Sequence, residues 1–246
     1  MEKIKYILWD IDGTLIDFNY AEKEGLKLCF EKYGLGKLAE EMLRKYKEIN
    51  HEYWKQFERG EISKKETMER RFIDLFNLYG FDTSIVERFN EDYQINMGDV
   101  ARFNPNGKDV VTRLKEKYKQ YAATNGTVEA QNRKLSKSGL NKMLDGIFIS
   151  EEIGFDKPST EFFQEMFKRV GSNNLEEYII IGDSLTSDIL GGNRIGIRTC
   201  WYNPSMNNNN YDYSPDYEIH DLSEILDLLQ VKKEKNKGIT LSRHKY

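Results

Sequence analysis

Short apolar runs alternate along most of the 246-residue chain with patterns typical of amphipathic helices. Such alternation predicts a parallel β-sheet with helices on its faces. The run of three isoleucines at 179–181 argues against an all-helical chain, because β-branched residues favour strands. We therefore expect an α/β fold with a Rossmann-like parallel sheet as its core. The expected strands are Ile4–Trp9, Gln120–Ala123, Gly146–Ser150, Tyr178–Ile181, Arg198–Tyr202 and Tyr217–Ile219.

Residues 18–98 interrupt this alternation. The segment contains no convincing strand, and its apolar residues recur at helical spacing in stripes that stop at glycines. We expect a helical domain inserted after the first strand, with the α/β core formed by residues 1–17 and 99–231. Residues 232–246 are expected to form a solvated basic tail.

Composition and charge argue against several classes of protein. The formal net charge is −4, but the last fifteen residues hold six basic groups and one acid, so the remaining 231 residues carry −9. An acidic surface binds nucleic acid poorly. No apolar run approaches the roughly 20 residues of a membrane span, and the opening apolar stretch is too short for a signal peptide. The chain has only two cysteines, too few for a disulfide framework, so a cytoplasmic protein is expected. No nucleic-acid or membrane partner is expected. The expected oligomeric state is a monomer or a homodimer.

Polar residues follow four of the apolar runs. The segments are Asp10-Ile11-Asp12-Gly13-Thr14, Thr124-Asn125-Gly126, Lys157-Pro158, and Gly182-Asp183-Ser184 with Asp188. Taken singly, each is also compatible with an Asp-Gly turn, a helix cap or a solvated lysine. The carboxyl ends of parallel strands meet at one edge of a sheet, however, so the four segments are expected to converge on one site.

Four of these side chains are carboxylates, and their convergence has a chemical consequence. Asp10, Asp12, Asp183 and Asp188 would repel one another in one cleft unless a cation neutralised them. A ligand set made only of oxygen selects a hard ion, and Mg²⁺ is the usual choice beside phosphate. The sequence therefore predicts a magnesium site.

The four segments together resemble the motifs of the haloacid dehalogenase-like superfamily of phosphohydrolases, which use an aspartate as nucleophile. The helical insert directly after the first motif looks like the type-1 cap of that family. Further segments are similar to the bacterial pyrimidine 5′-nucleotidase branch, namely Arg59–Ser63, Ile149–Gly154, Ser187–Gly192 and Thr199–Trp201. The resemblance implies an Mg²⁺-dependent phosphatase that forms an aspartyl-phosphate.

The resemblance also implies roles for the acidic residues. Asp10 would attack the phosphorus atom, and Asp12 would protonate the leaving oxygen and then deprotonate the attacking water. Mg²⁺ would be bound by the Asp10 carboxylate, the Asp12 main-chain carbonyl and Asp183. Asp188 would orient the metal-bound waters or Lys157.

Three further residues would bind the transferring phosphoryl group. The resemblance implies that the Thr124 hydroxyl and the Asn125 main-chain N–H donate to phosphoryl oxygens, and that Lys157 offsets their charge. Preorganised donors of this kind stabilise the transition state of group transfer.

The helical insert is expected to close over the site and contact the leaving group. Aromatic faces stack on nucleobases, which makes several residues of the insert candidates for substrate contact. They are Asn19, Tyr20, Tyr53, Trp54 and Phe57. Aromatic residues at helical spacing also commonly form a hydrophobic core, so both roles stay open for this set.

The expected substrate is a phosphate monoester, foremost a pyrimidine nucleoside 5′-monophosphate. Phosphoglycolate, a sugar phosphate and a β-phosphoglucomutase-type reaction remain alternatives. Dehalogenation is disfavoured because dehalogenases of this fold lack the second acid, which is present here as Asp12. A catalytically silent binding module would be expected to have lost some of the acids or Lys157, and all are present.

Overall fold

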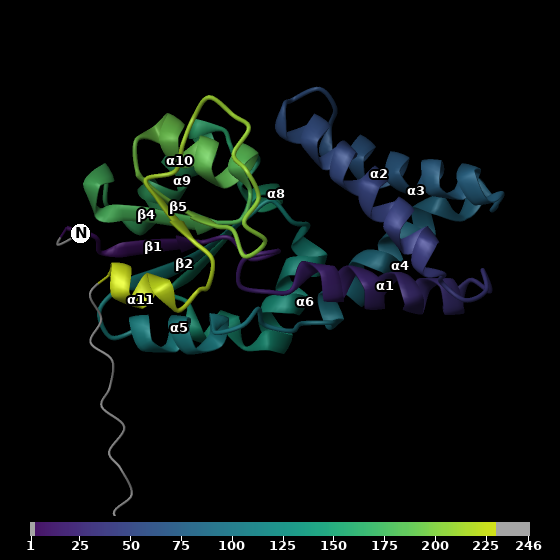
Figure 1. The fold of residues 1–246 in the computed structure, drawn as a ribbon, viewed down its shortest axis with the longest axis horizontal. Coiled ribbons are helices and arrows are strands. Elements are labelled where there is room, and N and C mark those ends of the chain that lie inside the picture. Colours follow the sequence, from purple (N-terminus) through teal and green to yellow (C-terminus); the bar gives the residue numbers. More distant parts are fainter. Residues whose placement is uncertain (1–2, 230–246) are drawn as a thin grey trace, which may run out of the picture.

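The computed structural model describes residues 3–229, so the expected basic tail at 232–246 lies outside the described residues. A six-stranded parallel sheet with strand order β3-β2-β1-β4-β5-β6 forms the core (Figure 1). The six predicted strands are confirmed and differ only at their ends. They are β1 (Tyr6–Trp9), β2 (Lys119–Thr124), β3 (Gly146–Ile149), β4 (Tyr178–Gly182), β5 (Arg198–Tyr202) and β6 (Tyr217–Ile219).

The strand order reverses at β1: β2 and β3 follow one another on one side of it, and β4, β5 and β6 on the other. Ile7 on β1 is paired with Gln120 of β2 on one side and with Ile179 of β4 on the other. In sheets of this order the connections from the two central strands diverge, which opens a crevice at their carboxyl ends. The predicted polar segments after β1 and β4 therefore border the same crevice.

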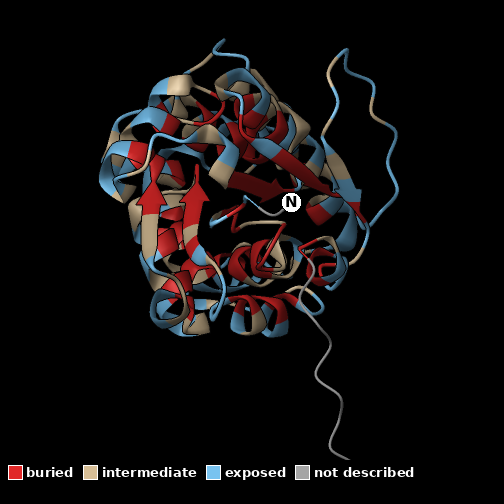
Figure 2. Cartoon of the chain, turned by 90° about the vertical axis from the view of Figure 1, so that its left-hand side faces the viewer, coloured by how far each residue is buried: buried red, intermediate tan, exposed pale blue. Residues whose placement is uncertain are grey.

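Helices cover both faces of the sheet (Figure 1). Ile7 and Trp9 face a hydrophobic cluster with α5 (Gly107–Leu114), α6 (Val128–Ser138) and α11 (Glu224–Leu228). Leu8, between them in sequence, faces the opposite cluster with α9 (Thr160–Val170). Because both faces are buried, the strands read as continuous apolar runs, and Figure 2 shows them buried along much of their length.

The remaining helical elements of this α/β part are short. Two of them, α8 (Ser150–Ile153) and the π-helical turn η3 (Leu185–Ile189), follow the carboxyl ends of β3 and β4. The others are α7 (Leu140–Met143), the turn η2 (Leu175–Glu177) and α10 (Leu190–Ile195).

Residues between β1 and α5 form a helical unit, as the sequence predicts; its boundaries at 18 and 98 remain a prediction. Its aromatic core is separate from the sheet, and the Phe72 ring lies 5.0–5.2 Å from the rings of Tyr46, Phe89 and Tyr93. Within residues 3–229, none of the helices combines the length and apolar character of a membrane span. The elements of the helical unit are α1 (Phe18–Lys32), α2 (Glu40–Glu58), α3 (Lys64–Tyr79), η1 (Thr83–Ile85) and α4 (Val86–Asp99).

The helical unit contacts the core most closely where α4 crosses α6. A Cβ atom at Gly98 would lie 2.8 Å from the Ala130 carbonyl oxygen and 2.9 Å from the Arg133 Cβ. Only glycine permits this approach of the two backbones, because any side chain would collide with main-chain atoms. Gly98 therefore fixes how the helical unit is seated on the core.

We expect Gly98→Ala to reduce the free energy of unfolding by about 1–3 kcal/mol, because overpacking forces a backbone shift. Urea denaturation measures this change. Ser136→Ala, at an exposed position of α6, is the control and should stay within about 0.5 kcal/mol of the wild type. A Gly98→Ala protein as stable as the control would contradict the close-packed seam.

Candidate active site

Lys157 lies at the centre of the predicted site, and its side chain is only 1% exposed. Its Nζ donates to Asp10 Oδ1 at 2.8 Å, to Asp188 Oδ1 at 2.6 Å and to the Ala123 carbonyl oxygen at 2.6 Å. These three contacts use all the N–H groups of the ammonium. Lys157 therefore joins the segments that follow β1 and β4 to the end of β2.

Thr14 links Asp10 to a third acid. Its hydroxyl lies 3.0 Å from Asp10 Oδ2 and 3.2 Å from Asp183 Oδ1, and it accepts a hydrogen bond from the Asp183 main-chain N–H at 3.0 Å. Asp10, Asp183 and Asp188 each offer one oxygen, and these oxygens all lie within 4.8 Å of one another. Within residues 3–229 the Lys157 ammonium pairs with two of these three carboxylates, so the cluster carries excess negative charge when all three are ionised.

Burial and charge shift the pKa values within this cluster. Burial raises the pKa of Asp10 to about 7, because Lys157 offsets only part of the cost of desolvation and of the nearby Asp188 charge. Burial also raises the pKa of Asp188 against the opposing effect of Lys157. Burial alone would lower the pKa of Lys157, but Asp10 and Asp188 outweigh it, and that pKa lies above its usual value. The lysine is therefore a fixed positive charge.

At two positions only glycine fits, because an acidic side chain of the cluster lies directly against the main chain. Gly13 has a φ of 92°, and a Cβ atom there would lie 2.4 Å from Asp183 Oδ2. A Cβ atom at Gly182 would lie 2.1 Å from Asp188 Oδ2. The glycines of the first and fourth segments thus leave room for the carboxylates of Asp183 and Asp188.

Asn125 has a structural contact that sequence reasoning did not find. Its side-chain Nδ2 donates to the Lys157 carbonyl oxygen at 2.8 Å, and its Oδ1 accepts from the Lys157 main-chain N–H at 2.9 Å. The neighbouring Thr124 hydroxyl accepts from the Gly126 N–H at 3.1 Å, whereas the helix cap that the sequence also allowed for this segment is supplied by Thr127 at the start of α6. Asn125 therefore holds the Lys157 loop against the end of β2.

All four predicted acids border one cleft, as the sequence predicts, but the Asp12 carboxylate is not among the three whose oxygens lie within 4.8 Å of one another. Its side chain accepts a hydrogen bond from Gln131 Nε2 at 2.5 Å and forms an ion pair with Lys134, which is fully buried. Strand β1 ends at Trp9, and the chain then turns at Gly13, so side-chain alternation does not extend to Asp12. The predicted role of its main-chain carbonyl at a metal remains a prediction.

A pocket of about 960 Å³ connects this cluster with the helical unit. Asn19 and Trp54 line it, as do Asp12 and Thr124 of the core. The Gln131 side chain also lines it, and within residues 3–229 its buried Oε1 has no hydrogen-bond partner. The volume exceeds what an inorganic phosphate needs and suits a small organic ligand.

Tyr20 and Tyr53 do not line this pocket, so the structure does not support them as substrate contacts. The guanidinium of Arg102 lies 3.8 Å from the centre of the Tyr20 ring, and the Tyr53 hydroxyl donates to Asp74 at 2.6 Å. Both rings lie on helix faces that contact charged residues, Arg102 for Tyr20 and Asp74 for Tyr53, and helical spacing alone does not tell which face meets the pocket. Phe57 lines a second, adjoining pocket instead.

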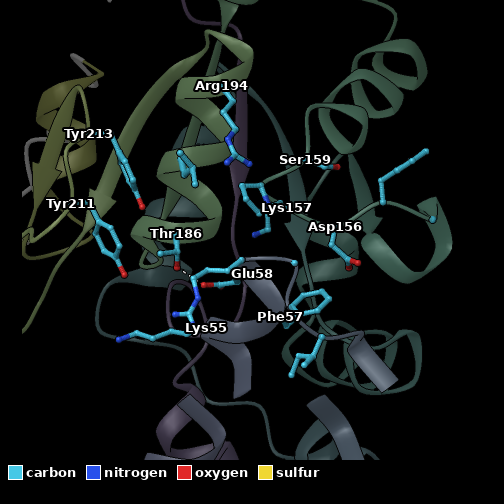
Figure 3. Close-up of a pocket in the computed structure, with 17 residues that line it drawn as sticks. Lys55, Phe57, Glu58, Asp156, Lys157, Ser159, Thr186, Arg194, Tyr211 and Tyr213 are labelled. Atoms are coloured by element: carbon cyan, nitrogen blue, oxygen red, sulfur yellow. Dashed lines mark hydrogen bonds between the residues drawn. The ribbon is translucent and has the colours of Figure 1, made fainter. Parts of the chain in front are cut away.

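The second pocket, of about 710 Å³, lies between the end of α2 and the core (Figure 3). Glu58 lines both pockets, and its carboxylate accepts hydrogen bonds from Thr186 and, at 3.3 Å, from the Ser184 hydroxyl. Beyond the turn that follows α2, Lys64 donates to Ser150 at 2.7 Å and Asp156 at 2.5 Å. Sequence reasoning missed these contacts, because nothing in the local pattern distinguishes Glu58 or Lys64 from solvated charges.

Comparisons with known proteins agree with this arrangement. The putative HAD-hydrolase YfnB of Bacillus subtilis is 35% identical over 94% of this chain and 98% of its own. A crystal structure of YfnB, described as bound to magnesium, superposes with a TM-score of 0.89 at 34% identity, covering 93% of this chain and all of that one.

Two further relatives carry the name pyrimidine 5′-nucleotidase. PynA of Streptococcus pneumoniae is 34% identical over 92% of this chain and 94% of its own, and YjjG of Escherichia coli is 26% identical over 92% and 98%. Residues 7–202 match the family described as haloacid dehalogenase-like hydrolases. With this match and the parallel sheet and clustered acids described above, the chain belongs to the haloacid dehalogenase-like hydrolase family.

Proposed function

We propose that this protein is an Mg²⁺-dependent phosphatase that hydrolyses pyrimidine nucleoside 5′-monophosphates through an aspartyl-phosphate. The observation that carries the proposal is the buried contact between Lys157 and Asp10 beside a pocket large enough for a nucleoside. The names of the relatives PynA and YjjG support the choice of substrate class.

The acidic cluster fits a divalent cation. Asp10, Asp183 and Asp188 present only oxygen ligands, and a single ammonium, that of Lys157, opposes their three charges. A hard ion with two positive charges balances the excess and binds such ligands well. Bound Mg²⁺ would supply charge neutralisation to the phosphoryl oxygens and favour the ionised form of Asp10.

The covalent step then follows from the placement of the two acids after β1. An Asp10 carboxylate oxygen attacks phosphorus, and the bond from phosphorus to the ester oxygen breaks while Asp12 donates a proton to that oxygen. In the second step Asp12 takes a proton from water, whose oxygen attacks phosphorus and releases Asp10 and inorganic phosphate. Asp12 must carry a proton when the substrate binds, and the contacts with Gln131 and Lys134 hold its ionised form in place for the second step, in which it takes a proton from water.

Donors at the ends of the other strands bind the phosphoryl oxygens in this proposal. The Thr124 hydroxyl and the Asn125 main-chain N–H face the charge that develops during transfer, and one such donor is typically worth about 2.7–4 kcal/mol. Lys157 already uses its three donors on protein oxygens, so it acts mainly by fixing Asp10 and Asp188. The helical unit over the pocket excludes water and contacts the leaving nucleoside.

The first test replaces the nucleophile. Asp10→Asn should reduce phosphate release from uridine 5′-monophosphate to background, because the neutral amide cannot form the covalent bond, while circular dichroism shows an unchanged fold. Exposed Asp227→Asn serves as the control and should keep wild-type activity. Wild-type rates from Asp10→Asn, or release only from sugar phosphates and phosphoglycolate in a parallel panel, would contradict the proposal.

The second test removes one metal ligand. Mg²⁺ should raise the thermal unfolding temperature of the wild type, since a ligand at about 100 times its Kd stabilises the folded state by about 2.7 kcal/mol. Asp183→Asn should abolish this shift, whereas Asp227→Asn should retain it. Without Mg²⁺ the Asp183→Asn protein should be no less stable than the wild type, because a repelling charge is gone. An equal Mg²⁺ shift in all three proteins would show that the ion binds elsewhere.

A further inference from the structure

Each of the four α-helices of the helical unit contributes one buried polar residue to the wall of the 960 Å³ pocket. They are Glu22 of α1, Asn50 of α2, Arg71 of α3 and Gln94 of α4, and their exposed fractions are 2%, 4%, 2% and 7%. The same pocket is bordered by Asp10 on the core side. These four buried polar residues therefore lie on the wall formed by the helical unit, whereas Asp10 and the proposed chemistry lie on the wall formed by the core.

Hydrogen bonds connect these residues in a row. Arg71 Nη1 donates to Asn50 Oδ1 at 2.9 Å, and Asn50 Nδ2 donates to Glu22 Oε1 at 3.1 Å. Arg71 Nη2 donates to Asn90 Oδ1 at 3.1 Å. Asn50 therefore separates the two charged groups and holds both in fixed orientation.

The two charges are incompletely paired. Among residues 3–229 no carboxylate forms an ion pair with Arg71, and the nearest ammonium to Glu22 is that of Lys47, at 3.7 Å. Burial raises the pKa of Glu22 to about 7, although Lys47 and Arg71 oppose it. A buried carboxylate and a buried guanidinium that are kept apart in this way destabilise a fold. A ligand that contacts both would supply the hydrogen bonds and charge pairing that the two groups lack.

Apolar side chains line the same pocket. Phe18, Trp54, Met68 and Met97 provide two aromatic rings and two thioethers, which are suited to the faces of a flat ring. A nucleobase has such faces, together with an edge that carries adjacent hydrogen-bond donors and acceptors. A sugar phosphate or phosphoglycolate has neither.

We propose that Glu22, Asn50 and Arg71 form a subsite for the hydrogen-bonding edge of the base, with Glu22 accepting from a base N–H and Arg71 donating to an adjacent carbonyl. This inference rests on the proposed nucleotidase function and adds which residues select the base. The phosphoryl group then occupies the Asp10 end of the pocket.

Steady-state kinetics on three substrates tests the subsite. They are uridine 5′-monophosphate, its N3-methyl analogue, which lacks the N–H, and ribose 5-phosphate, which lacks the base. The wild type should prefer the uridine nucleotide, and Glu22→Gln should lower kcat/KM for it by about 10- to 100-fold, mainly through KM. The same variant should leave kcat/KM for ribose 5-phosphate unchanged, because the phosphoryl end of the pocket is untouched.

The N3-methyl analogue provides a readout that does not depend on the folding of any variant. The wild type should lose about 10- to 100-fold in kcat/KM on it relative to the parent nucleotide, and Glu22→Gln should discriminate little between the two. Glu31→Gln makes the same chemical change at an exposed carboxylate of α1 that does not line the pocket, and it should behave as the wild type. Arg71→Met, checked for folding by thermal unfolding, should show the same selective loss as Glu22→Gln.

The outcomes separate the subsite from the function on which it rests. If the wild type hydrolyses the nucleotide and Glu22→Gln is unchanged, or loses activity equally on all three substrates, the subsite is wrong and the nucleotidase function stands. If the wild type shows no preference for the nucleotide over ribose 5-phosphate, the proposed function fails and the subsite fails with it.

Discussion

The contact of the Lys157 ammonium with Asp10, Asp188 and the Ala123 carbonyl oxygen is the interaction on which the rest of the site depends. Asp10 and Asp188 follow β1 and β4, and Ala123 lies near the end of β2, so one buried cation joins the ends of three strands. Removing it would leave two buried carboxylates without their partner, which typically costs 3–5 kcal/mol. The lysine thus serves both the fold and the proposed chemistry.

Neighbouring residues hold Lys157 and its acidic partners in position. Asn125 fixes the main chain of Lys157 through two hydrogen bonds, and Gly182 leaves room for Asp188 to reach the lysine. Thr14 then ties Asp183 to Asp10. The residues around the lysine are therefore a connected set in which each side chain has a defined partner, and the excess negative charge faces the pocket.

Much of the fold was predictable because its signals are local. Continuous apolar runs such as Ile179–Ile181 are typical of strands buried on both faces, and all six strands lie where the sequence predicts them. The convergence of Asp10, Lys157, Asp183 and Asp188 was also predictable, because parallel strands bring their carboxyl ends to one edge.

The remainder depends on tertiary contacts that no local pattern encodes. The direction of the Asp12 side chain follows from its pairing with Lys134, which is 122 residues away in sequence. Tyr20 and Tyr53 carry a helical pattern that does not tell which face meets the pocket. Glu22 and Arg71 read in sequence as solvated charges, and only the packing of four helices buries them together.

Direct detection of the covalent intermediate tests the central claim, that Lys157 holds Asp10 as the group that takes the phosphoryl from the substrate. Wild-type protein is mixed with uridine 5′-monophosphate and Mg²⁺, quenched in acid within a single turnover, digested and mapped by mass spectrometry. The account predicts one phosphoryl group on the peptide that contains Asp10, at the Asp10 carboxylate. A phosphoryl group on any other residue, or complete release of phosphate with no labelled peptide at any quench time, would contradict it.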